Sequence, residues 1–215
     1  MLSNAKLSVI AAFLACSSLV TAAPQGSSID RYNLLEDKDF LFSFNSTPTR
    51  FANGKTFPAL TGAGISLAAA DIPGCSMIAV HTHPRAAELF AVISGHVYTE
   101  AVPEAGVLDS EGKPRVIRNE IKAGEATIFY QGAMHYQINT ECEPAFALAA
   151  FPSEDAGAAG VAAGLFSVTD QALINTFGEV IKGEDVDKLR GYISKEMGFK
   201  VDQCLAKCGK QKRQA

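Results

Sequence analysis

The sequence predicts an all-β fold, an antiparallel sandwich or barrel, followed by a short helical extension. Three observations indicate this class. Short apolar and alternating stretches recur between residues 39 and 151. Gly, Pro, Asp or Asn separates most of them, as expected where strands are joined by tight connections. No helical pattern alternates with these stretches, which argues against a parallel α/β sheet.

The first expected strand is DFLFSF, in which Phe40, Phe42 and Phe44 lie on one face at a period of two. The strands expected after it read GISLAAADIPG, SMIAVHTH, ELFAVISG, HVYTEAV, RVIRNEI, EATIFY, HYQIN and AFALAAF. DSEGKP, at residues 109–114, is typical of a hairpin loop between two of them.

Beyond these strands the pattern changes to that of helices. The small-residue stretch SEDAGAAGVAAG is expected to be the connection. SVTDQALINTFG has a cap-like start at Ser167 and Asp170, and EDVDKLRGYI has helical apolar spacing. VDQCLAKCG predicts a third, short helix. We therefore expect a β-domain over residues 23–168, with helices and a basic tail over residues 169–215.

The N-terminus has the anatomy of a secretory signal peptide. Lys6 precedes an apolar stretch, and small residues follow it. The apolar stretch is shorter than the roughly 20 residues that a membrane span needs. A core helix is the alternative, but the small residues and Pro24 follow too closely for it. We expect residues 1–22 to be removed and the mature chain to be exported, into an extracellular space such as a cell wall.

Composition narrows the class of partner. Hydrophobic residues make up 47% of the chain and charged residues 20%, which is typical of a protein that forms a core. The 19 basic and 23 acidic residues give a net charge of −4. Removing the signal peptide takes away one lysine and makes the charge more negative. An acidic chain of this kind argues against nucleic acid as a partner.

Four cysteines remain in the mature chain: Cys75, Cys142, Cys204 and Cys208. An even number in an exported protein indicates disulfides, and four cysteines allow three pairings. Cys204 and Cys208 share one helix face, so a bridge between them, free thiols and an intermolecular bond all stay open. Asn45 begins the sequon NST, which predicts N-glycosylation, with a chance occurrence as the alternative.

The histidines predict a metal site. His81 and His83 lie two residues apart on an expected strand, so both side chains point to one face. Glu88 opens the next strand, and His135 lies in a second segment, GEATIFYQGAMHYQIN. Three nitrogens and one carboxylate suit divalent first-row metals, and a six-coordinate ion would keep two positions open. A surface pair of histidines is the alternative for HTH alone.

These two segments resemble the two cupin motifs. The first runs from Gly74 to Gly95 with one extra residue before its histidines. The second runs from Gly124 to Asn139, with Tyr130 where the motif usually has proline. The likeness is strongest to germin-like proteins and spherulins, and it covers about residues 39–195. It implies a jelly-roll barrel with a metal inside, and C-terminal helices that help to join subunits into a homo-oligomer.

Carried over from the family, the metal ligands are His81, His83, Glu88 and His135. The resemblance implies manganese, with another divalent first-row ion as the alternative. It also implies that the strands carrying Cys75 and Cys142 are neighbours, which predicts a Cys75–Cys142 bridge. The fourth histidine, His96, lies outside the motif and is expected to be an exposed strand residue.

The resemblance leaves the reaction open. Germin oxalate oxidases, which this chain resembles, carry two asparagines that orient the substrate. Ile78 and Ala68 stand at those positions here and cannot donate a hydrogen bond to a dianion. Superoxide dismutase activity is therefore expected ahead of oxalate oxidase activity. A structural or storage protein of a wall, spore or cyst, and a small-ligand binder, are the alternatives.

Overall fold

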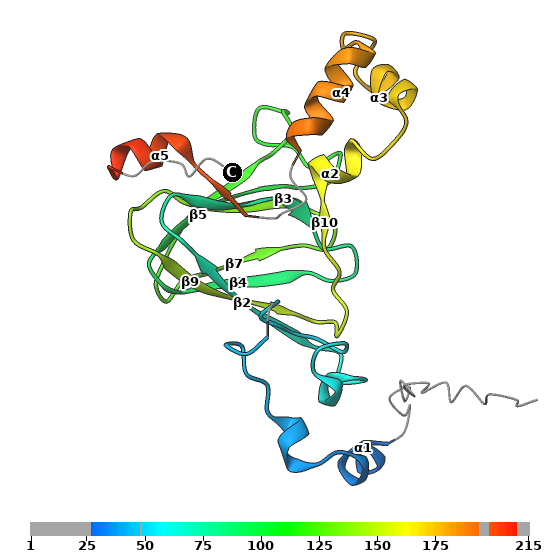
Figure 1. Cartoon of the computed structure of the whole chain (residues 1–215), viewed down its shortest axis with the longest axis vertical. Coiled ribbons are helices and arrows are strands. Elements are labelled where there is room, and N and C mark those ends of the chain that lie inside the picture. Colours follow the sequence, from blue (N-terminus) through cyan, green and yellow to red (C-terminus); the bar gives the residue numbers. More distant parts are fainter. Residues whose placement is uncertain (1–26, 48, 194–197, 210–215) are drawn as a thin grey trace, which may run out of the picture.

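The computed structural model describes residues 27–47, 49–193 and 198–209, and its centre is two facing antiparallel sheets (Figure 1). The first sheet runs β1 (Phe51–Ala52), β2 (Ser66–Ile72), β9 (Ala145–Phe151), β4 (Glu88–Ser94) and β7 (Ala126–Phe129). The second runs β10 (Ala159–Gly160), β3 (Ser76–Thr82), β8 (Met134–Asn139), β5 (His96–Val102) and β6 (Ile117–Lys122). This all-β jelly-roll sandwich confirms the predicted fold class.

Alternation along the strands decides which side chains enter the core. In β9 every second residue from Ala145 to Phe151 is buried, and β5 alternates in the same way. The two buried faces meet in one apolar cluster between the sheets. Its largest members are Phe90, Phe129, Phe151, Ile72, Ile121, Val92 and Val97. The hairpin loop predicted at residues 109–114 joins β5 to β6.

The N-terminal segment departs from its prediction. It contains α1 (Ser28–Leu34) and two short 3-10 helices, η1 (Asp37–Phe40) and η2 (Pro58–Leu60). The first two residues of the expected strand DFLFSF lie in η1, and its other four, residues 41–44, are irregular. The rings of Phe42 and Phe44 lie 5.0 Å apart, and Phe42 lies 5.4 Å from Phe57. The alternating phenylalanines therefore pack on one another and on Phe57 instead of on a face of a sheet. The strand prediction for DFLFSF is wrong.

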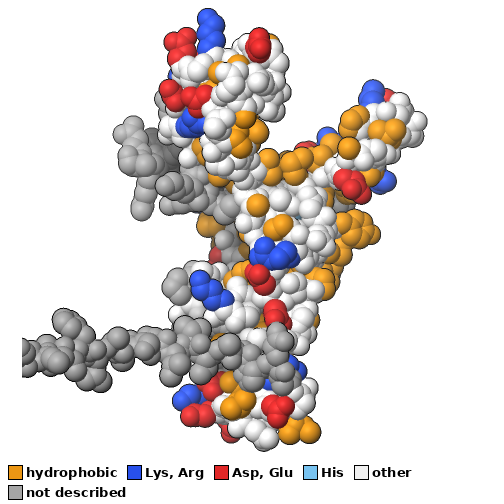
Figure 2. Space-filling view, turned by 90° about the vertical axis from the view of Figure 1, so that its right-hand side faces the viewer, with side chains coloured by type: hydrophobic (Ala, Val, Ile, Leu, Met, Phe, Trp, Pro, Cys, Tyr) orange, Lys and Arg blue, Asp and Glu red, His pale blue; other side chains and the backbone are white. Residues whose placement is uncertain are grey.

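Three helices follow the barrel: α2 (Val161–Leu165), α3 (Asp170–Thr176) and α4 (Gly183–Tyr192). The N-cap of α3 is Thr169, whose hydroxyl accepts a hydrogen bond from the amide of Ala172, rather than Ser167. Arg190 of α4 donates to the carbonyls of Phe166 and Val168. The pair α3–α4 projects away from the sheets (Figure 1). In Figure 2 acidic and basic side chains gather on this projecting lobe.

The chain returns to the barrel through β11 (Gly198–Lys200) and α5 (Asp202–Lys207). β11 pairs with the outer edge of β3, and two disulfides tie α5 to the barrel, Cys75–Cys204 and Cys142–Cys208. The predicted Cys75–Cys142 bridge is therefore wrong. Cys75 does lie beside the segment that carries Cys142, because the Cys75 amide donates to the carbonyl of Glu141 (3.0 Å). However, α5 lies against both cysteines and supplies their partners.

The expected signal peptide, residues 1–22, and the end of the basic tail lie outside the described residues. Within the described ranges, the longest helix is α4, with ten residues. Accordingly, no helix in this part of the chain has the length and apolar character to cross a bilayer.

Candidate metal centre

The metal centre predicted from the sequence is assembled from three strands. β3 carries His81 near its end and His83 just beyond it, β4 begins at Glu88, and β8 carries His135. β3 and β8 are antiparallel neighbours, and His81 stands opposite His135. A register shift between Ile78 and His81 marks a bulge just before the histidine pair.

The four side chains meet inside the barrel. One potential ligand atom of each residue lies within 4.8 Å of the corresponding atoms of the other three. None of the four residues is more than 8% exposed. Buried ionisable groups of this kind are rare unless they are paired or bind a metal. The structure therefore brings together all four residues that the sequence singled out.

Backbone carbonyls orient all three imidazole rings. The Nδ1 atom of each histidine lies within hydrogen-bond distance of a carbonyl oxygen. The acceptors are Ala79 for His81 (2.7 Å), Gly157 for His83 (2.5 Å) and Ala133 for His135 (2.9 Å). A ring that donates from Nδ1 leaves the Nε2 lone pair free, and this is how metal-binding histidines are usually held.

The free nitrogens face a carboxylate. The Oε2 atom of Glu88 lies 2.8 Å from Nε2 of His83 and 3.0 Å from Nε2 of His135. Two lone pairs and a carboxylate oxygen would repel one another at these distances unless a cation lies between them. That cation can be a proton in the metal-free protein or a metal ion in the loaded one. The donor set therefore fits a single divalent metal.

The protonation behaviour of these groups follows from the same contacts. Burial raises the pKa of Glu88, but hydrogen bonds from His135 and His83 outweigh burial and lower it to about 2. Burial lowers the pKa of His83, but the hydrogen bond and charge of Glu88 leave it raised. Burial, followed by the charge of His135, lowers the pKa of His81 to about 4. Glu88 is thus ionised and His81 neutral at neutral pH, as metal ligation requires.

Aromatic rings enclose the centre. Phe129 stacks on His135 with 4.1 Å between ring centroids and 7° between planes. Phe151 meets His83 edge to face at 4.7 Å. These rings hold the imidazoles in place and surround them with a low dielectric, which strengthens the electrostatic interactions within the site. Ile78 and Ala68 pack against the apolar core cluster, so the structure places hydrocarbon at both positions.

Sequence reasoning missed two polar residues inside the barrel. Gln137 and Thr99 are each 1% exposed, and they stand opposite each other on β8 and β5. The Gln137 Oε1 and Thr99 Oγ1 atoms have no partner among the described residues. Gln137 follows His135 by two residues and so points to the same face. Its place inside an apolar strand, in HYQIN, is the signal that could have identified it.

Two other residues named from the sequence do not join this centre. Asn45 is exposed in a turn, where a sequon is accessible. His96 begins β5, but it is half-buried rather than exposed as expected, and its ring nitrogens lie 3.9 Å from carboxylates of Glu120 and Glu141.

The fold and the buried donor set define a jelly-roll protein with a candidate metal centre inside the barrel. Comparison with known sequences agrees, because residues 32–178 match the family described as Cupin. Spherulin-1B of Physarum polycephalum is 33% identical over 194 residues, which cover 85% of this chain and 75% of the relative. The chain therefore belongs to the cupin family.

Further comparisons place it near the germin and spherulin branch. Germin-like protein subfamily 3 member 3 of Arabidopsis thaliana is 28% identical over 181 residues, covering 80% of this chain and 82% of the relative. Among solved structures, recombinant oxalate oxidase in complex with glycolate has a TM-score of 0.63 and 22% identity, covering 74% of this chain and 83% of that chain. The likeness to oxalate oxidase is one of fold alone. The sequence relatives identify the chain as a germin-like and spherulin-like cupin.

Proposed function

We propose that this protein is a secreted, manganese-dependent oxidoreductase that acts on superoxide in preference to oxalate. The observation that carries the proposal is the donor set, in which carbonyls fix three imidazoles so that their free nitrogens meet one carboxylate. A bound manganese ion would supply one-electron redox chemistry. An exposed sequon at Asn45 and two disulfides support export of the mature chain.

The chain's own residues would bind the metal ion and orient a water molecule beside it. His81, His83, Glu88 and His135 fill four positions, which leaves two open on a six-coordinate ion. Gln137, on the same strand face as His135, offers an amide oxygen that has no partner among the described residues. Such a group can hold a water molecule inside the barrel. A small diatomic substrate needs little more from a pocket than an open position on the metal and a nearby water molecule.

The side chains at Ile78 and Ala68 support superoxide over oxalate as the substrate. Both pack against the apolar core cluster, and neither offers a hydrogen-bond donor. A dianion such as oxalate gives up its hydration on entering a buried site and needs fixed donors in exchange. Superoxide carries only one negative charge, so it needs fewer hydrogen-bond donors than oxalate to enter the same site. These residues therefore support superoxide rather than oxalate as the substrate.

A single preparation tests the proposal. The mature protein is purified, its metal is identified by elemental analysis, and superoxide and oxalate turnover are measured on the same sample. We expect about one manganese ion per chain, measurable superoxide turnover, and little oxalate turnover. A folded barrel that binds no metal would contradict the metal centre. Full metal occupancy without turnover of either substrate would contradict the enzymatic proposal.

The second candidate is a structural or storage protein of a wall, spore or cyst, in which the metal stabilises the barrel. The similarity to Spherulin-1B and the near-complete burial of the four ligands favour it. It predicts metal occupancy and a melting temperature that falls on chelation, without turnover. A third candidate, a small-ligand binder, rests on a cavity of about 390 Å³ whose lining includes Ala101, Glu104 and Phe129.

Metal binding should depend on pH in a direction that the pKa shifts determine. Glu88 is ionised throughout the neutral range, so it adds no pH dependence there. The raised pKa of His83 means that the metal-free protein holds a proton at pH 6.5, which the metal must displace. Affinity should therefore rise with pH up to that pKa, and below about pH 4 the proton on His81 should weaken it further. Calorimetric titration with Mn²⁺ in buffers of different ionisation enthalpy measures the released proton. Equal proton release at pH 6.5 and pH 9 would contradict this assignment.

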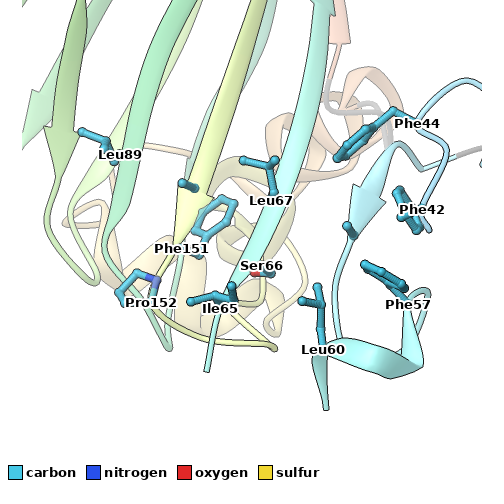
Figure 3. Close-up of a pocket in the computed structure, with 12 residues that line it drawn as sticks. Phe42, Phe44, Phe57, Leu60, Ile65, Ser66, Leu67, Leu89, Phe151 and Pro152 are labelled. Atoms are coloured by element: carbon cyan, nitrogen blue, oxygen red, sulfur yellow. The ribbon is translucent and has the colours of Figure 1, made fainter. Parts of the chain in front are cut away.

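We also propose that a second copy of the chain packs on the outer face of the first sheet. A groove of about 670 Å³ lies there between the N-terminal segment and the sheet (Figure 3). Phe42, Phe44 and Phe57 line one side, and Leu67 and Leu89 line the other. The side chains that line the groove are almost all apolar, which suits a contact with another apolar surface. The α3–α4 pair projects from the opposite side of the molecule and does not cover this groove (Figure 1).

Leu89→Asp should weaken this association. Leu89 is 48% exposed on β4 and lines the groove, so an aspartate would place an unpaired charge in the contact. We expect the dissociation constant of the oligomer to rise by about thirty-fold, the effect of losing one well-packed interface residue. Light scattering after size exclusion measures the change. Leu108→Asp, at an exposed leucine in the β5–β6 loop, is the matched control and should leave the mass unchanged.

A further inference from the structure

The four cysteine sulfurs are gathered at one point, which is more than two independent bridges require. Cys208 Sγ, which is bonded to Cys142, lies 3.4 Å from Cys75 Sγ and 4.0 Å from Cys204 Sγ. Cys75 Sγ and Cys204 Sγ are bonded to each other and form the other bridge. Cys208 therefore contacts both sulfurs of the Cys75–Cys204 bridge. If Cys208 were a thiolate, it would have that disulfide within reach.

The two bridges differ in exposure. The inner bridge, Cys75–Cys204, joins residues that are 0% and 6% exposed. The outer bridge, Cys142–Cys208, joins two half-buried residues. Access to sulfur limits thiol–disulfide exchange, so a thiol from solution reaches the outer bridge first.

We propose that this sulfur cluster is a thiol–disulfide exchange site, which a small thiol converts from a clamped pairing to a released one. The clamped pairing is that of the structure, in which both bridges tie α5 to the barrel. The released pairing is Cys75–Cys142 and Cys204–Cys208, in which one bridge lies within the barrel and the other joins α5 to its own C-cap residue. The Cys75 amide already donates to the carbonyl of Glu141, the residue before Cys142, so the two barrel cysteines lie on adjacent segments.

The exchange needs no net oxidant or reductant. The small thiolate attacks Cys142 Sγ, breaks its bond to Cys208, and stays as a mixed disulfide while Cys208 leaves as a thiolate. The Cys208 thiolate attacks Cys204 Sγ and expels Cys75 as a thiolate. Cys75 then attacks Cys142 Sγ and expels the small thiolate. Two disulfides are present before and after, and the thiol is regenerated.

Release would free the C-terminal segment that pairs with β3, the strand that carries His81. β11 pairs with β3 at residues 76–78, and the amide of Val201 donates to the carbonyl of Cys75 (2.9 Å). Leu205 of α5 is buried beside the cysteines and would remain as the principal apolar anchor. The outer edge of β3 then becomes exposed whenever that anchor opens, so the pairing of the cysteines controls access to this edge.

The experiment uses the whole mature protein and reduced glutathione below one equivalent. Samples are quenched with N-ethylmaleimide, digested without reduction, and their linked peptides are identified by mass spectrometry. We expect Cys75–Cys142 and Cys204–Cys208 peptides to appear while the number of free thiols stays near zero. Native cleavage after the exposed Lys200 should then yield a C-terminal fragment that separates under non-reducing, denaturing conditions. Unchanged linkages, or products that pair only Cys75 with Cys208, would overturn the proposal.

A double variant tests the order of attack. Cys142→Ser with Cys208→Ser removes the outer bridge and leaves the inner one. We expect glutathione to open the inner bridge at least about ten-fold more slowly than in the wild type, because the internal thiolate is gone. An equal rate would show that solvent thiols reach the inner bridge directly, which contradicts the relay. The wild-type mapping stands independently if this variant fails to fold.

Discussion

His83→Ala is expected to remove most of the bound metal while the secreted chain stays soluble. The variant loses one of four donors, and it leaves Glu88 without one of the two histidines that lower its pKa. Loss even of a group that only supports a ligand typically costs 10- to 100-fold in affinity, so loss of a ligand should cost at least about 100-fold. Elemental analysis of the purified variant and a Mn²⁺ titration measure the effect.

His96→Ala is the matched control for this prediction. It removes the same side chain from the same barrel, but His96 begins β5 and lies outside the cluster of four ligands. Its metal content should equal that of the wild type. Full metal content in His83→Ala would mean that the ligand set is wrong, whereas loss of metal in both variants would mean that histidine replacement acts through folding.

The candidate centre could be predicted because its geometry is largely local. A strand's period of two aims His81 and His83 at one face, and a short turn brings Glu88 to the start of the next strand. His135 is remote in sequence, and its place came from the resemblance to the cupin motifs. The structure adds what spacing cannot give: the carbonyls of Ala79, Gly157 and Ala133 that set the ring orientations.

The features that sequence reasoning missed depend on contacts between distant segments. The cysteine pairing depends on where α5 returns to the barrel, which neither the strand order nor the spacing of Cys204 and Cys208 determines. Phe42 and Phe44 have the alternation of a strand, yet they pack with Phe57 outside the sheet. Periodicity reports which side chains need burial, but the partner that buries them is set by the tertiary fold.

Phe129→Ala should affect both the fold and the metal centre. Phe129 is 2% exposed in the core and stacks on the ring of His135. Removing a buried phenylalanine side chain leaves a cavity, which we expect to lower the free energy of unfolding by about 3–5 kcal/mol. The His135 ring also loses the surface that holds it parallel, and its Nε2 atom is then free to move away from Glu88. Metal affinity should fall by about 10- to 100-fold, as for other groups that orient a ligand.

Phe90→Ala separates these two effects. Phe90 is 1% exposed in the same core cluster, and its ring lies one step further out, 6.3 Å from that of Phe129. The variant should lose a similar free energy of unfolding, measured by urea denaturation of the metal-free protein. It should retain wild-type affinity for Mn²⁺, because the stack between Phe129 and His135 remains. If Phe90→Ala weakens metal binding as strongly as Phe129→Ala, core stability rather than ring orientation controls the metal centre.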